Sequence, residues 1–234
     1  MSLDLTPGER TALAFIDEQA RHMTQLVYDW SAINSGSFHQ EGLARMREEL
    51  KSHFLWLNAP IEEIALSPMQ TITGEGEPVA QPLGQALRLC KRPEAPIQIF
   101  LGGHYDTVFG SDHPFQQPVF DGETCINGPG VADLKGGLVV MLKALEALEQ
   151  SDHADQLGWE VLLNPDEEIG SPGSDPWLRE AAERCHLGLI YEPALPDGTL
   201  VGARKGSGNF TWVVRGVSAH AGREHHLGRN AIVA

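Results

Sequence analysis

Short apolar runs alternate with longer segments of helical periodicity along most of the chain. Strands are predicted near residues 61–66, 86–92, 97–103, 160–164, 187–191, 199–205 and 208–216. Apolar residues three and four positions apart predict helices near residues 8–33, 39–57, 133–149 and 175–185. Because strands and helices alternate through the middle of the chain, the pattern favours an α/β fold with a mostly parallel sheet flanked by helices.

Local signals add detail at two helix starts and one loop. The run Thr6-Pro7-Gly8-Glu9 has the pattern of a capping box with proline in the first turn. The pair Asp175-Pro176 is predicted to cap the helix that follows it. The segment from residue 73 to residue 84 is rich in glycine and proline and is expected to be a surface loop.

Side chains typical of metal sites follow the predicted strands in the middle of the chain. The run that ends at Leu101 is followed by His104 and Asp106, which project to the same side of an extended backbone. Imidazole and carboxylate groups suit zinc, and a carboxylate behind a ligating histidine usually fixes its tautomer. We therefore predict that His104 is a ligand and that Asp106 orients it. Taken alone, the pair would suit a surface histidine as well.

Asp133 lies where a glycine-rich loop meets a predicted helix. It could simply cap that helix. Glycine is also favoured where the backbone takes unusual dihedral angles or approaches a ligand closely. The glycines that crowd this residue are Gly128, Gly130, Gly136 and Gly137. A carboxylate in such a loop could bridge two cations, so both interpretations stay open.

Two further acidic motifs follow later strands. Glu167 and Glu168 are adjacent, so their side chains point in opposite directions on an extended backbone. One could bind a metal while the other acts as a general base, but the spacing does not say which. A solvated turn would have the same composition. Glu192 precedes Pro193, which keeps its backbone extended.

These side chains are expected to meet, because ligand sites in open α/β sheets lie outside the carboxyl ends of the strands. If these residues had no common function, chance would have to place a histidine or carboxylate at one motif after another. The combination therefore indicates a two-metal hydrolase far more strongly than any single member does.

Four motifs also occur in the order of a known enzyme family. They are Gly103-His104-Tyr105-Asp106-Thr107-Val108, the run 130–137 around Asp133, Asp166-Glu167-Glu168-Ile169-Gly170-Ser171, and Ser218-Ala219-His220-Ala221-Gly222. The chain resembles the family of glutamate carboxypeptidase, acetylornithine deacetylase and succinyl-diaminopimelate desuccinylase, which are co-catalytic zinc amidohydrolases. The similarity extends from about the N-terminal helix to the last residue.

The resemblance implies a set of metal ligands. His104 and Glu192 would bind one zinc ion, Asp133 would bridge the two ions, and Glu168 would bind the other. The family often has a cis peptide bond directly after the bridging aspartate, here Asp133-Leu134. Glutamate at position 192 is more like the carboxypeptidase and deacetylase branches than the aminoacylases.

The resemblance also implies catalytic roles. Glu167 would be the general base, and Asp106 the carboxylate behind His104. His220 would stabilise the developing oxyanion from a smaller domain that reaches the active site of the partner subunit, although Ser218-x-His220 alone fits a histidine at a strand end. A water activated by two zinc ions would cleave the amide bond of an N-acyl amino acid or a dipeptide. Co2+ or Mn2+ could substitute for zinc, and a homodimer is expected.

Domain boundaries follow from the same resemblance. Residues 1–206 would form a catalytic zinc-binding domain without its C-terminal part, and residues 207–234 the beginning of a smaller α+β lid or dimerisation domain. Family members continue further and supply a second histidine ligand, which no histidine here matches. We therefore expect the sequence to be a portion of a longer protein. The alternative is an inactive truncated relative that binds a ligand or partner without turnover.

Composition limits the setting. A formal net charge of -15 disfavours nucleic acid and anionic membranes as partners, and no apolar run is long enough for a membrane span. The three cysteines have no zinc-site spacing and, with the absence of a signal-peptide pattern, favour a reducing cytoplasm. The sequence lacks a phosphate-binding Gly-x-x-x-x-Gly-Lys-Ser/Thr motif and a Gly-x-Ser-x-Gly elbow, which argues against a phosphate-binding protein and a serine hydrolase.

Overall fold

A five-stranded mixed sheet forms the centre of the molecule. The computed structural model describes residues 5–122, 125–199, 201–203, 205–206 and 208–233. The strands lie in the order β1 (Ile61–Ala65), β4 (Gln85–Lys91), β8 (Leu157–Asn164), β5 (Ile97–His104) and β9 (Leu187–Ile190). β5 pairs in parallel with β8 and with β9, whereas β4 is antiparallel to both β1 and β8. Every strand of this sheet except β4 therefore runs in one direction, which confirms the predicted α/β class.

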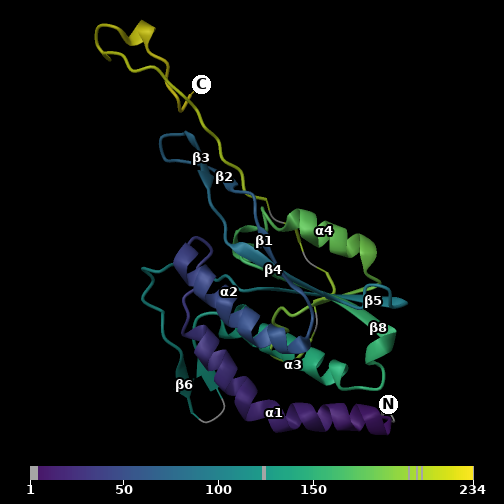
Figure 1. The fold of residues 1–234 in the computed structure, drawn as a ribbon. Coiled ribbons are helices and arrows are strands. Elements are labelled where there is room, and N and C mark those ends of the chain that lie inside the picture. The colour runs from purple at the N-terminus through teal and green to yellow at the C-terminus, as the bar shows by residue number, and fades with distance from the viewer. Residues whose placement is uncertain (1–4, 123–124, 200, 204, 207, 234) are drawn as a thin grey trace.

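Helices cover both faces of the sheet (Figure 1). α1 (Pro7–Ser31), α2 (Gln40–Phe54) and α3 (Gly136–Glu149) lie on one face, and α4 (Asp175–Arg184) lies on the other. The larger core cluster joins these three helices to β4, β5 and β8. Its members include Trp30, Leu50 and Leu142 on the helices and Leu89 and Val161 on the strands. A smaller cluster joins Ala181 of α4 to Phe100 and Leu162 on the opposite face. Short helical turns also lie at Leu55–Leu57, Val131–Lys135, Ala154–Gln156, Glu167–Ile169 and His225–Leu227.

The two predicted helix starts differ in outcome. The capping box at Thr6 is confirmed, because the Thr6 N–H donates to Glu9 Oε2 at 2.6 Å and the Glu9 N–H donates to Thr6 Oγ1 at 3.2 Å. The cap predicted for α4 is wrong, because Ser174 occupies the N-cap position and Asp175 is the first helical residue. The Asp175 carboxylate instead accepts from Arg179 Nε, one helical turn away, at 2.7 Å.

Most of the glycine- and proline-rich segment predicted as a loop belongs to a hairpin. β2 (Met69–Ile72) pairs with β3 (Pro78–Gln81), so residues 78–81 of the segment form a strand. Residues 73–77, where the Thr73 N–H donates to Glu77 O at 2.9 Å, and residues 82–84 lie outside the strands, as predicted. Pro78 is tolerated because it is the first residue of its strand. A second hairpin, β6 (Val119–Asp121) and β7 (Cys125–Asn127), is joined to α1 by stacking of Phe120 on Tyr28 at 5.0 Å between ring centroids.

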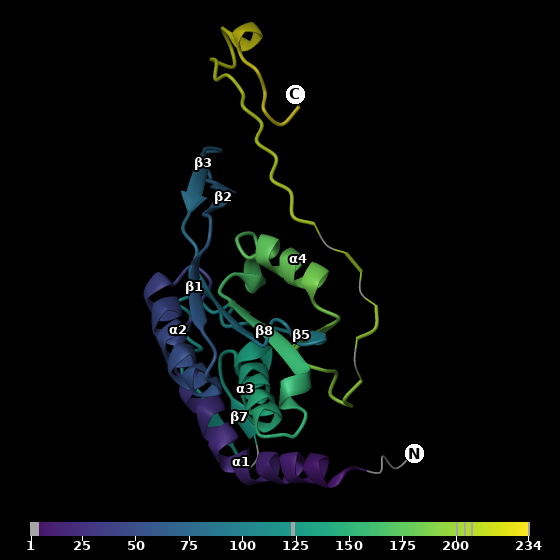
Figure 2. The same ribbon diagram turned by 45° about the vertical axis from the view of Figure 1, so that its right-hand side comes forward.

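The strands predicted at 199–205 and 208–216 are not formed by the residues that the structure describes there; positions 200, 204 and 207 lie outside that description. Residues 208–216 run as an extended arm away from the sheet and past the β2–β3 hairpin (Figure 2). Arg215 Nη2 lies 2.7 Å from Glu77 Oε1 at the hairpin turn. The bridge between Val217 and Arg229 closes the loop at the end of the arm. The domain division at residue 206 stays a prediction.

Within the described part of the chain, no helix is both long enough and apolar enough to cross a membrane.

Candidate metal centre

The parallel strands bring three of the predicted motifs to one edge of the sheet. His104 is the last residue of β5 and lies opposite Asn164, the last residue of β8. The short turn that contains Glu167 and Glu168 follows β8, and Glu192 follows β9 after one intervening residue. Because β5, β8 and β9 are parallel, their carboxyl ends coincide.

His104 is the centre of this cluster. Its side chain is 1% exposed, and its two ring nitrogens face different groups. Nδ1 lies 3.1 Å from the Asp106 carbonyl oxygen and 3.2 Å from Asp106 Oδ1. Nε2 lies 2.9 Å from Asp133 Oδ1, 3.7 Å from Glu192 Oε1 and 3.9 Å from Glu167 Oε2. One side of the imidazole is thus held by Asp106, while the other points into a group of carboxylates.

Asp133 is not a helix cap. α3 begins at Gly136, and the residue at its N-cap is Lys135, so the capping interpretation is excluded. Asp133 lies in the preceding turn, Val131–Lys135, where its backbone is not helical, and the peptide bond to Leu134 is cis, as the family resemblance implied. Its side chain is half exposed to solvent, and its Oδ1 contacts His104 Nε2.

The turn that carries Asp133 is fixed by a lysine that the sequence analysis did not single out. Lys135 is fully buried, and its Nζ donates to the carbonyl oxygens of Trp30 at 3.0 Å and Ile33 at 2.6 Å, at the C-terminus of α1. Burial lowers the pKa of Lys135 to about 7. A lysine next to a predicted ligand normally suggests a solvated charge, and only the packing reveals its anchoring role.

Two sets of side chains at this edge could hold a metal ion. His104, Asp133 and Glu168 form one set, and His104, Glu167 and Glu192 form the other; in each, the ligand atoms lie within 4.8 Å of one another. Imidazole nitrogen and carboxylate oxygen are donors that suit Zn2+, so the residues present fit such an ion. All four predicted ligands are brought together here, and Glu167, predicted as the base, lies among them.

The charges of the cluster perturb one another. Burial, and then the negative charge of Asp133, raise the pKa of Glu168 to about 7. Burial disfavours the charged form of His104, but the hydrogen bond and charge of Asp106, followed by the charges of Glu192 and Glu167, outweigh it and raise the pKa to about 9. Several negatively charged carboxylates close together repel one another, and a bound cation would offset this repulsion.

His220 does not join this cluster. It lies in the loop at the end of the extended arm, where its Nδ1 accepts from the N–H groups of Gly222 and Arg223 at 3.2 Å each. His225 and His226 lie in the same exposed loop. His186 accepts from the Gln98 N–H at the opposite end of β5 from His104. Within the described residues, the two candidate metal sets therefore share a single histidine.

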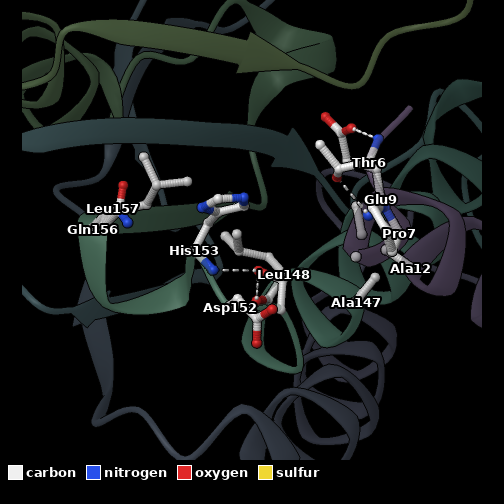
Figure 3. Close-up of a pocket in the computed structure, with 13 residues that line it drawn as sticks. Thr6, Pro7, Glu9, Ala12, Ala147, Leu148, Asp152, His153, Gln156 and Leu157 are labelled. Atoms are coloured by element: carbon white, nitrogen blue, oxygen red, sulfur yellow. Dashed lines mark hydrogen bonds between the residues drawn. The ribbon is translucent and has the colours of Figure 1, made fainter. Parts of the chain in front are cut away.

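A pocket of about 610 Å3 opens beside the cluster. It is lined by Glu168 and Ile169 together with residues 36–40, 107–108 and 110–112, including Ser37, His39 and Asp112. Another pocket, of about 740 Å3, lies between the N-terminus of α1 and the turn after α3, where Pro7, Ala12, Leu148 and Leu157 give it a mainly apolar wall (Figure 3). None of the predicted site residues lines this second pocket, so the first is the candidate for substrate.

Residues 100–230 match the model of Peptidase family M20/M25/M40. The chain belongs to this family. It is 34% identical over 142 residues to carboxypeptidase G2 of Pseudomonas sp. (strain RS-16). The matching segment covers 58% of this chain and 33% of the relative. It is 32% identical over 153 residues to succinyl-diaminopimelate desuccinylase of Stutzerimonas stutzeri (strain A1501), and this match covers 59% of this chain and 39% of the relative. These findings confirm the family identified from the motifs.

A solved structure agrees at the level of the fold. Human carnosine dipeptidase 1 has a TM-score of 0.63 at 16% identity, over 79% of this chain and 41% of that one. The M20 chain described here spans between 33% and 41% of the length of these three relatives. The cluster from His104 to Glu192 lies inside the segment that matches the family model.

Proposed function

We propose that the protein is a metal-dependent hydrolase that uses two zinc ions to cleave an amide bond in an N-acyl amino acid or a small peptide. The observation that carries this proposal is the gathering of His104 with the carboxylates of Asp133, Glu167, Glu168 and Glu192 at the carboxyl ends of parallel strands. Sequence similarity to a carboxypeptidase and to desuccinylases also supports the proposal.

In this proposal the ligands divide between two ions. His104 and Glu192 would hold one, Glu168 would hold the other, and Asp133 would serve both. When bound, the pair of ions acidifies a water molecule and polarises the substrate carbonyl. A second histidine is expected from chain beyond these residues, and Co2+ or Mn2+ is expected to substitute for zinc.

Glu167 is the proposed general base. A carboxylate oxygen of Glu167 takes a proton from the attacking water and passes it to the nitrogen of the leaving amine. Its exposure favours Glu167 over Glu168 for this task. The Glu167 side chain is exposed, whereas Glu168 is half-buried, and a base that exchanges protons with both water and substrate needs the more accessible position. Asp106 holds the backbone of both glutamates.

Further parts of the proposal concern the whole protein. Residues 1–206 are proposed as the catalytic domain and residues 207–234 as the start of a lid domain through which two subunits pair. His220 is proposed to donate a hydrogen bond to the oxyanion in the partner's active site. It lies in the loop closed by the Val217–Arg229 bridge and is not among the residues of the His104 cluster of its own chain, which is compatible with such a role.

The proposal is tested on the intact gene product with N-acetyl, N-succinyl and glutamyl amides as substrates. We expect one of these classes to be hydrolysed, with activity lost on dialysis against a chelator and restored by Zn2+. Metal analysis of the purified protein should give two ions per chain. A protein that binds one ion or none, and hydrolyses no amide after Zn2+ addition, would instead be the non-catalytic relative.

A further inference from the structure

We infer that Ser37 is a positioning residue of the proposed hydrolase: through Asp106 it aligns His104 and the turn that carries Glu167 and Glu168. The inference rests on the proposed function. It assigns a role to a residue that lies outside the four sequence motifs and far from them along the chain.

The Asp106 carboxylate is the point where separate parts of the site meet. Oδ1 accepts from the Glu167 N–H at 3.2 Å and lies 3.2 Å from His104 Nδ1. Oδ2 accepts from the Glu168 N–H at 3.2 Å and from the Ser37 hydroxyl at 2.7 Å. The serine contact is the shortest of the four, and it comes from 69 residues earlier in the chain.

The backbone around Ser37 is held independently of its hydroxyl. The Ser37 N–H donates to Thr107 O at 3.3 Å, and the Thr107 N–H donates to Ser35 O at 3.0 Å, so residues 35–37 run alongside residue 107. A Cβ on Gly36 would lie 2.5 Å from the Phe109 carbonyl oxygen, so this approach requires glycine. Replacing the Ser37 side chain leaves these backbone contacts in place.

Loss of the hydroxyl removes the strongest fixed donor from a fully buried carboxylate. Asp106 is fully buried, whereas Ser37 is 6% exposed and lines the pocket beside the cluster, so a water that enters from the pocket would be a less well fixed donor than the serine hydroxyl. The carboxylate then keeps only its contacts with Glu167, Glu168 and His104, all of which belong to the candidate site, so a shift of the carboxylate is passed to these residues. Residues that hold a metal ligand in this way typically change metal affinity or activity by about 10- to 100-fold when mutated. Because Ser37 also lines the pocket proposed for substrate, a positioning role is recognised by losses in metal affinity and kcat that are larger than any change in KM.

The same segment supplies a matched control. Ser35 is as deeply buried as Ser37 and lies two residues away, but within the described part of the chain its Oγ has no hydrogen-bond partner. Ser35→Ala therefore removes a buried hydroxyl without touching Asp106. Ser37→Thr keeps a hydroxyl at position 37.

The experiment compares Ser37→Ala, Ser35→Ala and Ser37→Thr in the intact gene product. Zn2+ affinity is measured by competition with a chromogenic chelator, folding by circular dichroism and thermal melting, and kcat and KM with the best amide substrate. We expect Ser37→Ala to weaken Zn2+ binding and lower kcat by about tenfold each, with KM within about twofold of the wild type. Ser35→Ala should match the wild type, and Ser37→Thr should recover most of the loss.

Equal behaviour of Ser37→Ala and Ser35→Ala would overturn the inference while leaving the proposed function intact. If Ser37→Ala does not fold, Ser37→Cys replaces it, since a thiol has similar size but is a weak donor; wild-type Zn2+ affinity and kcat in that variant would also overturn it. Absence of both Zn2+ binding and amide hydrolysis in the wild type would instead refute the proposed function.

Discussion

Strand β4 and the segment 208–216 carry the same alternation of apolar and other side chains but end in different surroundings. In β4, Leu87 and Leu89 are fully buried, because β1 and β8 pair with the strand on both sides and helices cover the sheet. In the arm, Phe210 and Trp212 are 86% and 89% exposed, and the backbone has no strand beside it among the described residues. An alternating pattern thus encodes the capacity to form a strand, and neighbours decide whether it forms.

The largest expected effect concerns Glu167, at the edge of the sheet where the candidate site lies. Glu167→Gln should lower kcat by about 1,000-fold or more, because an amide cannot take up the proton of the attacking water. Zn2+ content should not change. The measurement is a pair of assays, metal analysis and steady-state kinetics, on the intact gene product. Glu183→Gln, an exposed carboxylate on α4, is the control, and unchanged turnover in Glu167→Gln would remove Glu167 as the base.

The comparison of β4 with the arm can be made directly by truncating one side chain in each. Leu89→Ala should lower the free energy of unfolding by about 3 kcal/mol, since it leaves a cavity in the main core cluster. Trp212→Ala should lower it by less than about 0.5 kcal/mol, because the indole is almost fully exposed in this chain. Urea unfolding of the 234-residue chain gives both values. A large loss for Trp212→Ala would show that the arm packs against something in solution.

The arm can also be tested as part of a catalytic site. His220→Ala in the intact gene product should lower kcat by about 100-fold, the effect of losing one oxyanion donor. Mixing His220→Ala with Glu167→Gln subunits tests the expected exchange between partners. If His220 acts in the partner's site, hybrid dimers contain one site with both residues and recover activity. No recovery in subunits shown to exchange would contradict action across the dimer.

The smallest expected effects come from two ion-pair sites, one at the C-terminal end of α3 and one between the β2–β3 hairpin and the arm. Burial alone would raise the pKa of Glu149, but hydrogen bonds from Arg92, Lys91 and Trp159 outweigh it and lower the pKa to about 2. Glu149→Gln should therefore cost about 2 kcal/mol of unfolding free energy at pH 7. Glu77, whose pair with Arg215 is exposed on both sides, is the control, and Glu77→Gln should have almost no effect.

The pH dependence of the Glu149 contribution follows from the sign of its shift. Because the folded pKa lies below the unfolded value near 4.5, the stabilisation is complete above about pH 5 and is lost as the pH falls toward 2. The difference in unfolding free energy between wild type and Glu149→Gln should accordingly be largest at pH 7 and shrink by pH 3. Urea titrations at the two pH values measure it, and a difference that does not shrink would contradict the assignment.

Much of the core was predictable because its signals are local. Burial of Leu87 and Leu89 follows from alternation in one strand, and the capping box at Thr6 needs only four consecutive residues. The glycines and prolines of residues 73–84 predict a loop, but they occur mainly at the hairpin turn and at a strand start, so composition alone does not reveal the β2–β3 hairpin. The arm was overpredicted for the opposite reason, since its β-forming residues have no partner strand in the described chain.

For the candidate site, the sequence determined which donors are available and in what order. His104, Asp106, Asp133, Glu167, Glu168 and Glu192 could all be selected from motifs, because each follows a strand or a glycine-rich turn. Tertiary structure alone decided that the ring nitrogens of His104 face Asp106 on one side and carboxylates on the other. It alone brought in Ser37 and Lys135, whose contacts lie 69 and about 100 residues away along the chain. The physical reason is that a hydrogen bond depends on separation in space, which motifs fix only over a few residues, whereas packing of the sheet and helices fixes it between distant segments.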